Sequence, residues 1–214
     1  NLELMKMRKR FLFLPFLLLL VSGLVSCEEV EDEGKYYDWQ ARNEAYIDSI
    51  KNVAGDRYVA TEEGIRAVEV GEMFILQDYL VSTDKHPRYI YCKKLVKNAE
   101  GEIPVWTEAV NAFYYGTLIT GEKFDGGFDG YGALDQNIPN PPGREPTPFS
   151  WSTDFLITES TLRTGWKIFL QYMAVGERWL VYLPTDSAYG SEGSGTIPGY
   201  SALVFDVVLN KVIE

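Results

Sequence analysis

Residues 165–205 constrain the fold of this chain more than any other stretch. They alternate short apolar runs with glycine, which is typical of compact elements joined by tight connections. A helix that starts with Trp166, followed by two strands on either side of a glycine-containing loop, can gather aromatic side chains around one hollow. In order, the stretch contains Gly165-Trp166, an apolar helical run to Met173, Gly176-Glu177, a strand over 178–183, Ser187-Ala188-Tyr189-Gly190, Ile197-Pro198 and a strand over 202–207. We therefore predict an aromatic cup at the centre of the fold.

The first 26 residues are expected to be a secretory signal. Lysines and arginines at 6, 8, 9 and 10 precede an apolar run over 11–21, shorter than the stretch of about 20 residues that a membrane-spanning helix needs. The run leads into Leu24-Val25-Ser26-Cys27, which is similar to a bacterial lipobox, in which the cysteine is acylated. This pattern predicts a cell-envelope lipoprotein, attached through a lipid on Cys27 to the outer membrane on its periplasmic or outer side. The alternative is an ordinary signal with a chance cysteine.

Residues 28–33 contain five acids in six positions and are expected to stay solvated. Two interpretations stay open for this run. It is either a spacer that holds the folded part off the membrane or an export tag, since such runs resemble signals that send some lipoproteins to the outer face of the outer membrane. The formal net charge of −11 disfavours binding to nucleic acid or anionic lipid through charge.

An amphipathic helix is predicted over 35–54, with Gly55 as its stop signal. Its apolar face consists of Tyr36, Trp39, Tyr46, Ile47 and Ile50. Such a stripe most often docks on the chain's own domain, and otherwise it is a partner surface. Residues 73–81 are apolar enough to be buried, but their pattern does not decide between helix and strand. We interpret residues 27–87 as an acidic linker and helical extension.

Strand patterns follow, which indicates an α+β fold. Residues 88–97 are rich in Tyr, Ile and Val, and Cys92 within them is expected to be a small buried hydrophobe rather than a reactive thiol. With Cys27 acylated, no internal disulfide is expected. Residues 109–117 alternate, with Val110, Ala112 and Tyr114 on one face and Asn111, Phe113 and Tyr115 on the other.

Strand character resumes at Phe149 and gives way to a short helix. Thr164 is its expected N-cap and Gly176 its end. One face of this helix holds Trp166, Phe169, Leu170 and Met173. Strands over 178–183 and from 202 onward complete the pattern, the last with Leu203, Phe205, Val207 and Leu209 on one face.

Residues 126–147 form an insertion with five glycines and four prolines, a density that opposes both helix and sheet. A long loop beside a site is more often a lid or rim. Asp125, Asp129 and Asp135 lack the alternating spacing of a calcium loop, and His86, the only histidine, has no second ligand near it in sequence. We therefore expect no metal and no cofactor.

Taken together and in order, these motifs resemble the FKBP family of peptidyl-prolyl isomerases over residues 88–214. The stretch 165–205 carries much of the match. Upstream, Tyr114-Tyr115-Gly116-Thr117-Leu118 and Gly121-Glu122-Lys123-Phe124-Asp125 look like the family's Tyr-x-Gly and Phe-Asp motifs. The resemblance implies an FKBP-like domain over 88–214, with a curved antiparallel sheet wrapped on a short helix. It also implies a peptidyl-prolyl cis-trans isomerase that assists protein folding.

The resemblance further implies a pocket and its ligands, namely proline-containing polypeptides and macrolide inhibitors. Trp166 would form the pocket floor, Tyr189 would offer its hydroxyl to a substrate carbonyl, and the backbone N–H of Arg163 would stand where the family often has Ile. The implied catalytic residues are Tyr114, Phe124, Asp125, Tyr189 and Phe205. The implied substrate-binding residues are Phe149, Leu162, Arg163, Trp166, Ala188 and Ile197.

The site so implied contains aromatic residues and no plausible nucleophile with its base, which favours catalysis by desolvation of the X–Pro amide. The chain departs from the family pattern in places. The loop from Asp125 to Phe149 is long, so Arg144 is only a candidate partner of Asp125, and Ile197-Pro198-Gly199 replaces the usual Ile-Pro-Pro. The alternatives to an active isomerase are a non-catalytic binding or chaperone module and a purely structural lipoprotein.

Overall fold

The computed structural model describes residues 34–127 and 151–213. The chain divides into two compact units, Asn1–Tyr37 and Asp38–Glu214, and every described helix and strand belongs to the second. Residues 34–37 form a turn that is closed by a hydrogen bond of 2.7 Å from Tyr37 N to Gly34 O. The predicted signal, Cys27 and the acidic run lie outside the described residues.

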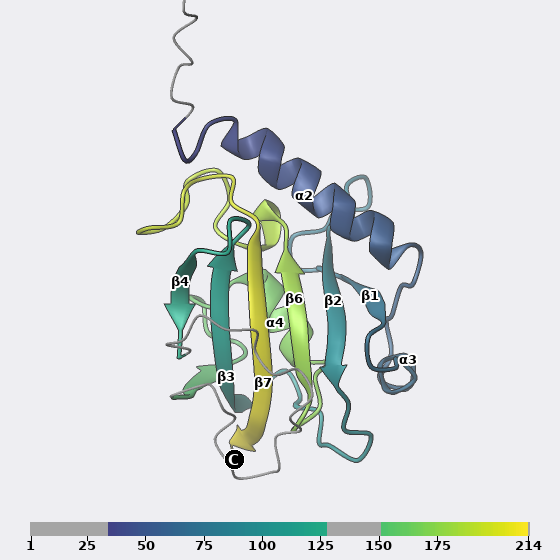
Figure 1. Ribbon diagram of the computed structural model, residues 1–214. Helices are drawn as coiled ribbons and strands as arrows, with labels where there is room; N and C mark the ends of the chain where they lie inside the picture. The colour runs from purple at the N-terminus through teal and green to yellow at the C-terminus, as the bar shows by residue number, and fades with distance from the viewer. Residues whose placement is uncertain (1–33, 128–150, 214) are drawn as a thin grey trace, which may run out of the picture. The chain divides into compact units, whose positions relative to one another are not determined.

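The second unit is built on a seven-stranded antiparallel sheet (Figure 1). Its strands, in spatial order, are β1 (Met73–Gln77), β2 (Tyr89–Val96), β6 (Arg178–Leu183), β7 (Leu203–Ile213), β3 (Ala109–Leu118) and β4 (Lys123–Gly126), with β5 (Thr153–Leu156) also paired to β3. β4 pairs with the last part of β3 and β5 with the first part, so both lie along the same edge of one strand. This sheet with its few helices confirms the predicted α+β class.

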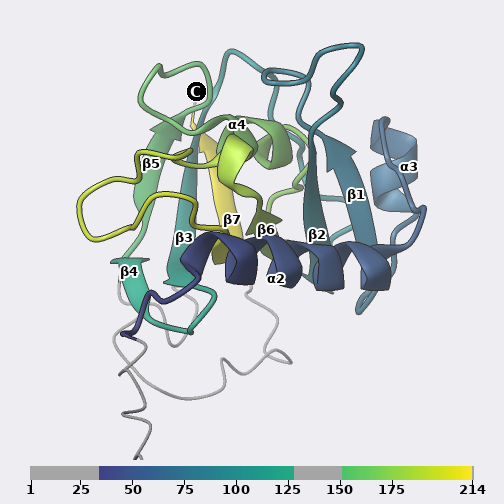
Figure 2. The same cartoon turned by 90° about the horizontal axis from the view of Figure 1, so that it is seen from above.

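Alternating side chains give the sheet two different faces. In β3, Val110, Ala112 and Tyr114 point into the main core, whereas Phe113 and Tyr115 pack on the opposite face, as predicted. Figures 1 and 2 show α4 (Thr164–Leu170) on one face of the sheet and α2 (Trp39–Ala54) on the other. The main core therefore lies between the sheet and α4.

The helix α4 is shorter than predicted, and Thr164 is not its cap. The helix begins at Thr164 and ends at Leu170, with Arg163 in the cap position and without a side-chain cap bond. The predicted cap is wrong because the Thr164 hydroxyl donates to Asp78 Oδ2 at 2.8 Å instead. The helix also stops well before Gly176. Its predicted apolar face is nevertheless buried at Trp166, Phe169, Leu170 and Met173.

The first long helix starts later than the predicted residue 35. α2 begins at Trp39 because Asp38 takes a left-handed conformation (φ 47°), which interrupts a right-handed helix. Gly55 ends the helix, as predicted. Trp39 is buried and donates from Nε1 to the Ser201 hydroxyl at 2.9 Å, which ties α2 to the segment before β7. No helix within the described ranges is long and apolar enough to cross a membrane.

The segment over 73–81 is an edge strand followed by a turn. β1 pairs with β2 along its whole length, so the sheet begins upstream of residue 88. The short helix α3 (Glu62–Arg66) precedes β1, and the Thr61 hydroxyl caps it by accepting from Gly64 N at 3.1 Å. Cys92 on β2 is buried, which raises the pKa of its thiol and fits the predicted role as a small hydrophobe.

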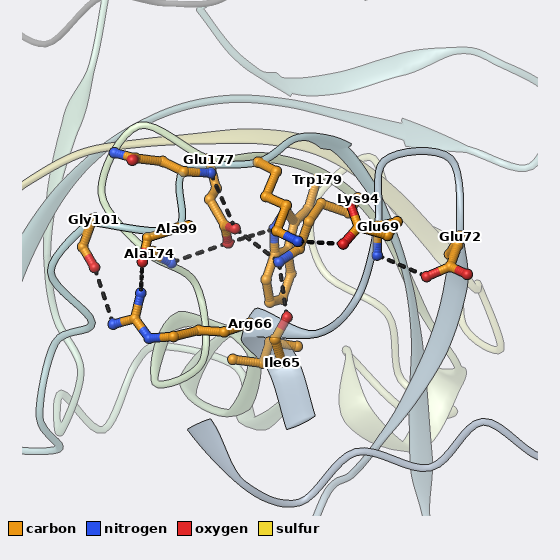
Figure 3. A network of polar contacts seen from close by, with 12 residues as sticks. Ile65, Arg66, Glu69, Glu72, Lys94, Ala99, Gly101, Ala174, Glu177 and Trp179 are labelled. Carbon is orange, nitrogen blue, oxygen red and sulfur yellow. Dashed lines mark hydrogen bonds and ion pairs between the residues drawn. The ribbon is translucent and has the colours of Figure 1, made fainter. Parts of the chain in front are cut away.

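A buried ion pair joins α3 to the sheet (Figure 3). Lys94 Nζ donates to Glu177 Oε1 at 2.8 Å and to the carbonyl oxygen of Ile65 at 2.9 Å. Glu177 Oε2 accepts from Trp179 Nε1 at 3.0 Å and from Ala174 N at 3.2 Å. The Lys94 and Glu177 side chains are only 1% and 3% exposed, so this network is sealed from water.

Candidate active site

A cavity of about 300 Å³ lies between α4 and the strands β3, β4, β5 and β7. Aromatic rings supply much of its wall, and charged and hydroxyl-bearing residues complete it. The lining consists of Tyr114, Phe124, Asp125, Thr153, Asp154, Phe155, Glu159, Thr161, Leu162, Arg163, Trp166, Leu183, Tyr189, Leu203 and Phe205. A concave site in which aromatic side chains are combined with polar groups can bind and orient a small ligand.

Trp166 anchors this cavity from the first turn of α4 and is 4% exposed. Its ring centroid lies 5.3 Å from that of Tyr114 and 5.1 Å from that of Phe205, both edge to face, and 4.8 Å from that of Phe155. Such aromatic pairs each add about 0.5–1.5 kcal/mol beyond the burial of their area. The indole is therefore held in one orientation by three rings from three different strands.

Gly116 on β3 makes room for two further rings. A Cβ at this position would lie 2.7 Å from the Phe124 ring and 2.8 Å from the Phe205 ring. The two rings meet edge to face with centroids 5.5 Å apart. Any side chain at position 116 would push these rings away, so the Tyr-x-Gly motif places Tyr114 and clears space for its neighbours.

Tyr114 and Asp125 form the polar pair of the cavity. The Tyr114 hydroxyl donates to Asp125 Oδ2 at 2.9 Å, and Asp125 Oδ1 accepts from Gly126 N at 2.8 Å. Burial, reinforced by the bond to the Asp125 carboxylate, raises the pKa of Tyr114 far above its usual value. Tyr114 therefore stays a neutral donor at physiological pH, while Asp125 remains exposed to solvent.

Arg163 and Tyr189 form a second pair at the cavity. The guanidinium carbon of Arg163 lies 5.1 Å from the centroid of the Tyr189 ring, which is a cation–π contact. Arg163 also donates from Nη2 to the carbonyl oxygen of Thr161 at 3.0 Å. Within the described part of the chain the Tyr189 hydroxyl has no hydrogen-bond partner, so it is available to a ligand.

The structure brings eight of the predicted site residues together around this cavity. These are Tyr114, Phe124, Asp125, Leu162, Arg163, Trp166, Tyr189 and Phe205. Ala188 and Ile197 do not line it, because both are buried in the core beside it. Phe149 and Arg144 lie outside the described residues, as does most of the predicted insertion over 126–147. Across residues 34–127 and 151–213, no group of three His, Cys, Asp or Glu side chains could hold a metal ion.

Phe155 is the main lining residue that the sequence analysis missed. It lies in the four-residue strand β5, opposite Val110 of β3, and its ring is 5.6 Å from that of Tyr114. The only signal was the short run over 153–156, in which Phe155 stands between Asp154 and Leu156. Leu183 and Leu203, at the ends of β6 and β7, were predicted as strand residues but not as lining.

Gly127, near the start of the predicted insertion, and Trp151, which follows it in the chain, both lie beside Tyr114. Gly127 N donates to the carbonyl oxygen of Tyr114 at 3.0 Å, and the Trp151 ring lies 5.8 Å from the Tyr114 ring, edge to face. A Cβ at Gly127 would lie 2.5 Å from the carbonyl oxygen of Trp151. Trp151 is 43% exposed, so an accessible indole stands close to the Tyr114–Asp125 pair.

Fold and site define a class of α+β proteins in which an antiparallel sheet and one short helix enclose an aromatic pocket. The family model described as FKBP-type peptidyl-prolyl cis-trans isomerase matches residues 101–210 of the 214 residues. The chain belongs to this family. Its recognition from the motifs in the sequence is therefore confirmed.

Two curated relatives extend the comparison. The chain is 27% identical over 190 residues to the FKBP-type peptidyl-prolyl cis-trans isomerase FkpA of Aeromonas hydrophila, which covers 85% of this chain and 56% of that protein. It is 28% identical over 155 residues to the FKBP-type 22 kDa peptidyl-prolyl cis-trans isomerase of Escherichia coli, covering 72% of this chain and 56% of that protein. The chain thus spans a little over half the length of these two relatives.

A solved structure of a peptidyl-prolyl cis-trans isomerase from Pseudomonas syringae is also similar. It is 22% identical, with a TM-score of 0.47, and the match covers 80% of this chain and 96% of the other.

Proposed function

We propose that this protein is a peptidyl-prolyl cis-trans isomerase of the cell envelope that helps exported proteins fold. The observation that carries the proposal is the cavity floored by Trp166, with the donor Tyr114 and the accessible Tyr189 hydroxyl at its wall. Membership of the family supports the same activity. The substrates would be proline-containing polypeptides.

The chemistry needs no covalent step. An X–Pro bond rotates slowly because amide resonance is lost at the top of a barrier of about 20 kcal/mol. The rotated amide has less charge separation than the planar one, so an apolar pocket disfavours the planar ground state more than the transition state. This difference is what accelerates the reaction. Lowering the barrier by about 4 kcal/mol would raise the isomerisation rate roughly a thousandfold.

The polar groups would orient the peptide within the pocket. The Tyr189 hydroxyl and the backbone N–H of Arg163 would donate to substrate carbonyls, and Asp125 would face the twisting amide. The Asp125 carboxylate is held in place by Tyr114 and by Gly126 N, so its orientation is set before a substrate arrives. Trp166 would lie beneath the proline ring.

The deciding experiment measures isomerisation of a short X–Pro peptide by the full chain. We expect a rate well above background that falls at least tenfold in Tyr189→Ala and in Phe124→Ala. Tyr58→Ala is the matched control, because Tyr58 is 54% exposed and does not line the cavity. No rate above background would reject the isomerase. Peptide binding without turnover would instead support a binding or chaperone module with the same pocket.

Macrolide binding offers a second readout at the same site. A macrolide seated over the Trp166 ring should change tryptophan fluorescence on titration. In Trp166→Phe the change should disappear, while the signals of the other tryptophans remain. An unchanged response in Trp166→Phe would place the ligand elsewhere.

The envelope location rests on residues 1–33, which lie outside the described residues. We infer that Cys27 carries a lipid and anchors the protein to the outer membrane, because a basic and apolar leader ends at a lipobox-like sequence. Mass spectrometry of the mature N-terminus from a bacterial host should find acylated Cys27 in the membrane fraction. Cys27→Ser should release the protein into the soluble fraction. An unmodified Cys27 would leave an ordinary signal peptide as the explanation.

A further inference from the structure

The segment around the end of β1 contacts α4 at both ends of that helix. Asp78 follows β1 directly and accepts from the Thr164 hydroxyl at 2.8 Å, at the first residue of α4. The Tyr79 hydroxyl donates to Gln171 Oε1 at 3.1 Å, at the residue that caps the end of α4. Both contacts come from residues that precede the family-matched range 101–210.

The Asp78 carboxylate is held firmly in its orientation. The residue is completely buried, and its other oxygen, Oδ1, accepts from Leu80 N at 3.2 Å. Its backbone is fixed as well, because Asp78 N donates to the carbonyl oxygen of Arg88 at 2.9 Å and Asp78 O accepts from the Ser82 hydroxyl at 2.7 Å. The edge hairpin of β1 and β2 therefore determines where the acceptor for Thr164 lies.

A shift of Thr164 would also move Trp166, which forms the floor of the pocket. The next residue, Gly165, is packed so closely that a Cβ there would lie 2.6 Å from Leu183 Cδ2 and 2.9 Å from the carbonyl oxygen of Ser187. Trp166 follows at once, within the same turn of α4. The start of the helix therefore has little free space, and the hydroxyl bond to Asp78 adds a second restraint on it.

We propose that Asp78 is a positioning residue of the pocket. Through Thr164 it sets the placement of α4 and thereby of the Trp166 ring against Tyr114, Phe155 and Phe205. The edge hairpin, outside the family-matched range, is then part of the binding unit rather than an appended extension. The expected effect on turnover rests on the proposed function. The expected effect on the placement of Trp166 does not depend on that activity.

The test uses the full chain and removes the hydroxyl with Thr164→Val, restoring it with Thr164→Ser. The first readout is the Trp166 resonance in fluorine NMR of protein labelled with 5-fluorotryptophan, assigned through Trp166→Phe. The second is the separate measurement of kcat and KM on an X–Pro peptide. Thr61→Val is the matched control, because it removes a hydroxyl of the same kind whose hydrogen bond caps α3 rather than holding α4.

We expect Thr164→Val to move the Trp166 resonance and to lower kcat/KM by about tenfold, since one hydrogen bond to a charged group is lost. Thr164→Ser should restore both readouts. Thr61→Val should lower the melting temperature without moving the Trp166 resonance or kcat/KM. If Thr164→Val does not fold, Asp78→Asn tests the same contact with its shape preserved.

The proposal is overturned if the Trp166 resonance stays in place while Thr164→Val loses stability as Thr61→Val does. A wild-type chain without turnover would reject the proposed function, and the Trp166 resonance would still decide the positioning role of Asp78.

Discussion

The network around Lys94 and the wall of the aromatic pocket both place a carboxylate beside aromatic rings, yet they differ in how far their polar atoms are exposed to solvent. Both oxygens of Glu177 and both oxygens of Asp125 accept hydrogen bonds, but the side chains of the Lys94–Glu177 pair are at most 3% exposed, whereas Asp125 is exposed. At the pocket, moreover, the Tyr189 hydroxyl has no hydrogen-bond partner within the described residues. Polar groups that maintain the fold are buried with their partners, whereas the site keeps its carboxylate at the surface and one hydroxyl available to a ligand.

A second buried pair follows the same rule as the first. Arg178 and Asp206 face each other across β6 and β7 with two parallel bonds of 2.8 and 2.7 Å, and both side chains are about as buried as the Lys94 pair. Burial raises the pKa of the Asp206 carboxyl, and the Arg178 guanidinium opposes that effect. Saturated polar pairs of this kind are expected to matter for stability and not for turnover.

The largest effect should come from opening the sealed network. Lys94→Met leaves Glu177 charged and buried without its cation, so the free energy of unfolding should fall by about 3–5 kcal/mol. Urea unfolding measures it. The double variant Lys94→Met with Glu177→Leu should recover much of the loss, because no uncompensated charge remains. A loss below about 1 kcal/mol in the single variant would show that the network is not sealed in solution.

Removing the Phe155 ring from the pocket wall should lower both stability and turnover. The loss of unfolding free energy should be smaller than in Lys94→Met. Phe155→Ala deletes a half-buried ring that touches Tyr114 and Trp166, and we expect a loss of about 2 kcal/mol in unfolding free energy. The rate constant kcat/KM should fall about tenfold. Phe155→Leu is the control and should retain most of both. Unchanged turnover in Phe155→Ala would show that β5 does not contribute to the active site.

Tyr114→Phe should distinguish most clearly between polar groups that maintain the fold and polar groups that serve the site. The ring packing is kept and one bond to an exposed carboxylate is lost, so stability should change by less than about 1 kcal/mol. Turnover should still fall several-fold, because Asp125 loses the donor that orients it. Tyr182→Phe, a tyrosine outside the pocket, is the comparison and should leave kcat/KM unchanged. Equal turnover in the two variants would contradict an orienting role for Tyr114.

The smallest effect concerns alkaline pH. Burial raises the pKa of Tyr182 to about 12, and the pKa of Tyr114 is raised further, both from an ordinary 10.0. A group whose folded-state pKa is raised contributes stability that is complete below the unfolded pKa and is lost as pH rises through the folded one. Unfolding free energy should therefore decline above pH 10, and Tyr182→Phe should flatten the decline between pH 10 and 12. An identical slope of unfolding free energy against pH in Tyr182→Phe would show that Tyr182 does not cause the decline.

The motifs name Trp166, Tyr114, Phe124 and Phe205 as pocket residues, and the structure places all four around one cavity. Their order is informative because Gly116 is kept small by the rings of Phe124 and Phe205, and Gly165 by Leu183 and the Ser187 carbonyl. Their roles in catalysis stay a prediction. Phe155 was missed because four residues of β5 carry too little periodicity to assign a face. The cap at Thr164 was wrong because its partner, Asp78, is distant in sequence, and local propensity has no information on such a contact.

Two features upstream of β2 could also not be read from the sequence. The start of α2 depends on the left-handed conformation of Asp38, and an aspartate in a run of polar and aromatic residues gives no signal of it. The pattern over 73–81 left helix and strand open, and pairing with β2 decides the matter in favour of β1. The pairing of β1 with β2 is a tertiary contact, so a local pattern could not supply it.

The shared edge of β3 has a consequence for protein engineering. Because β4 and β5 are each registered on β3 independently, the sheet does not dictate how many residues connect them. A reporter domain or an affinity tag placed in this connection should leave strand register intact. Gly127 and Trp151, the described residues at either side of this connection, both lie beside Tyr114, so a fluorophore attached next to either of them should respond to peptide binding.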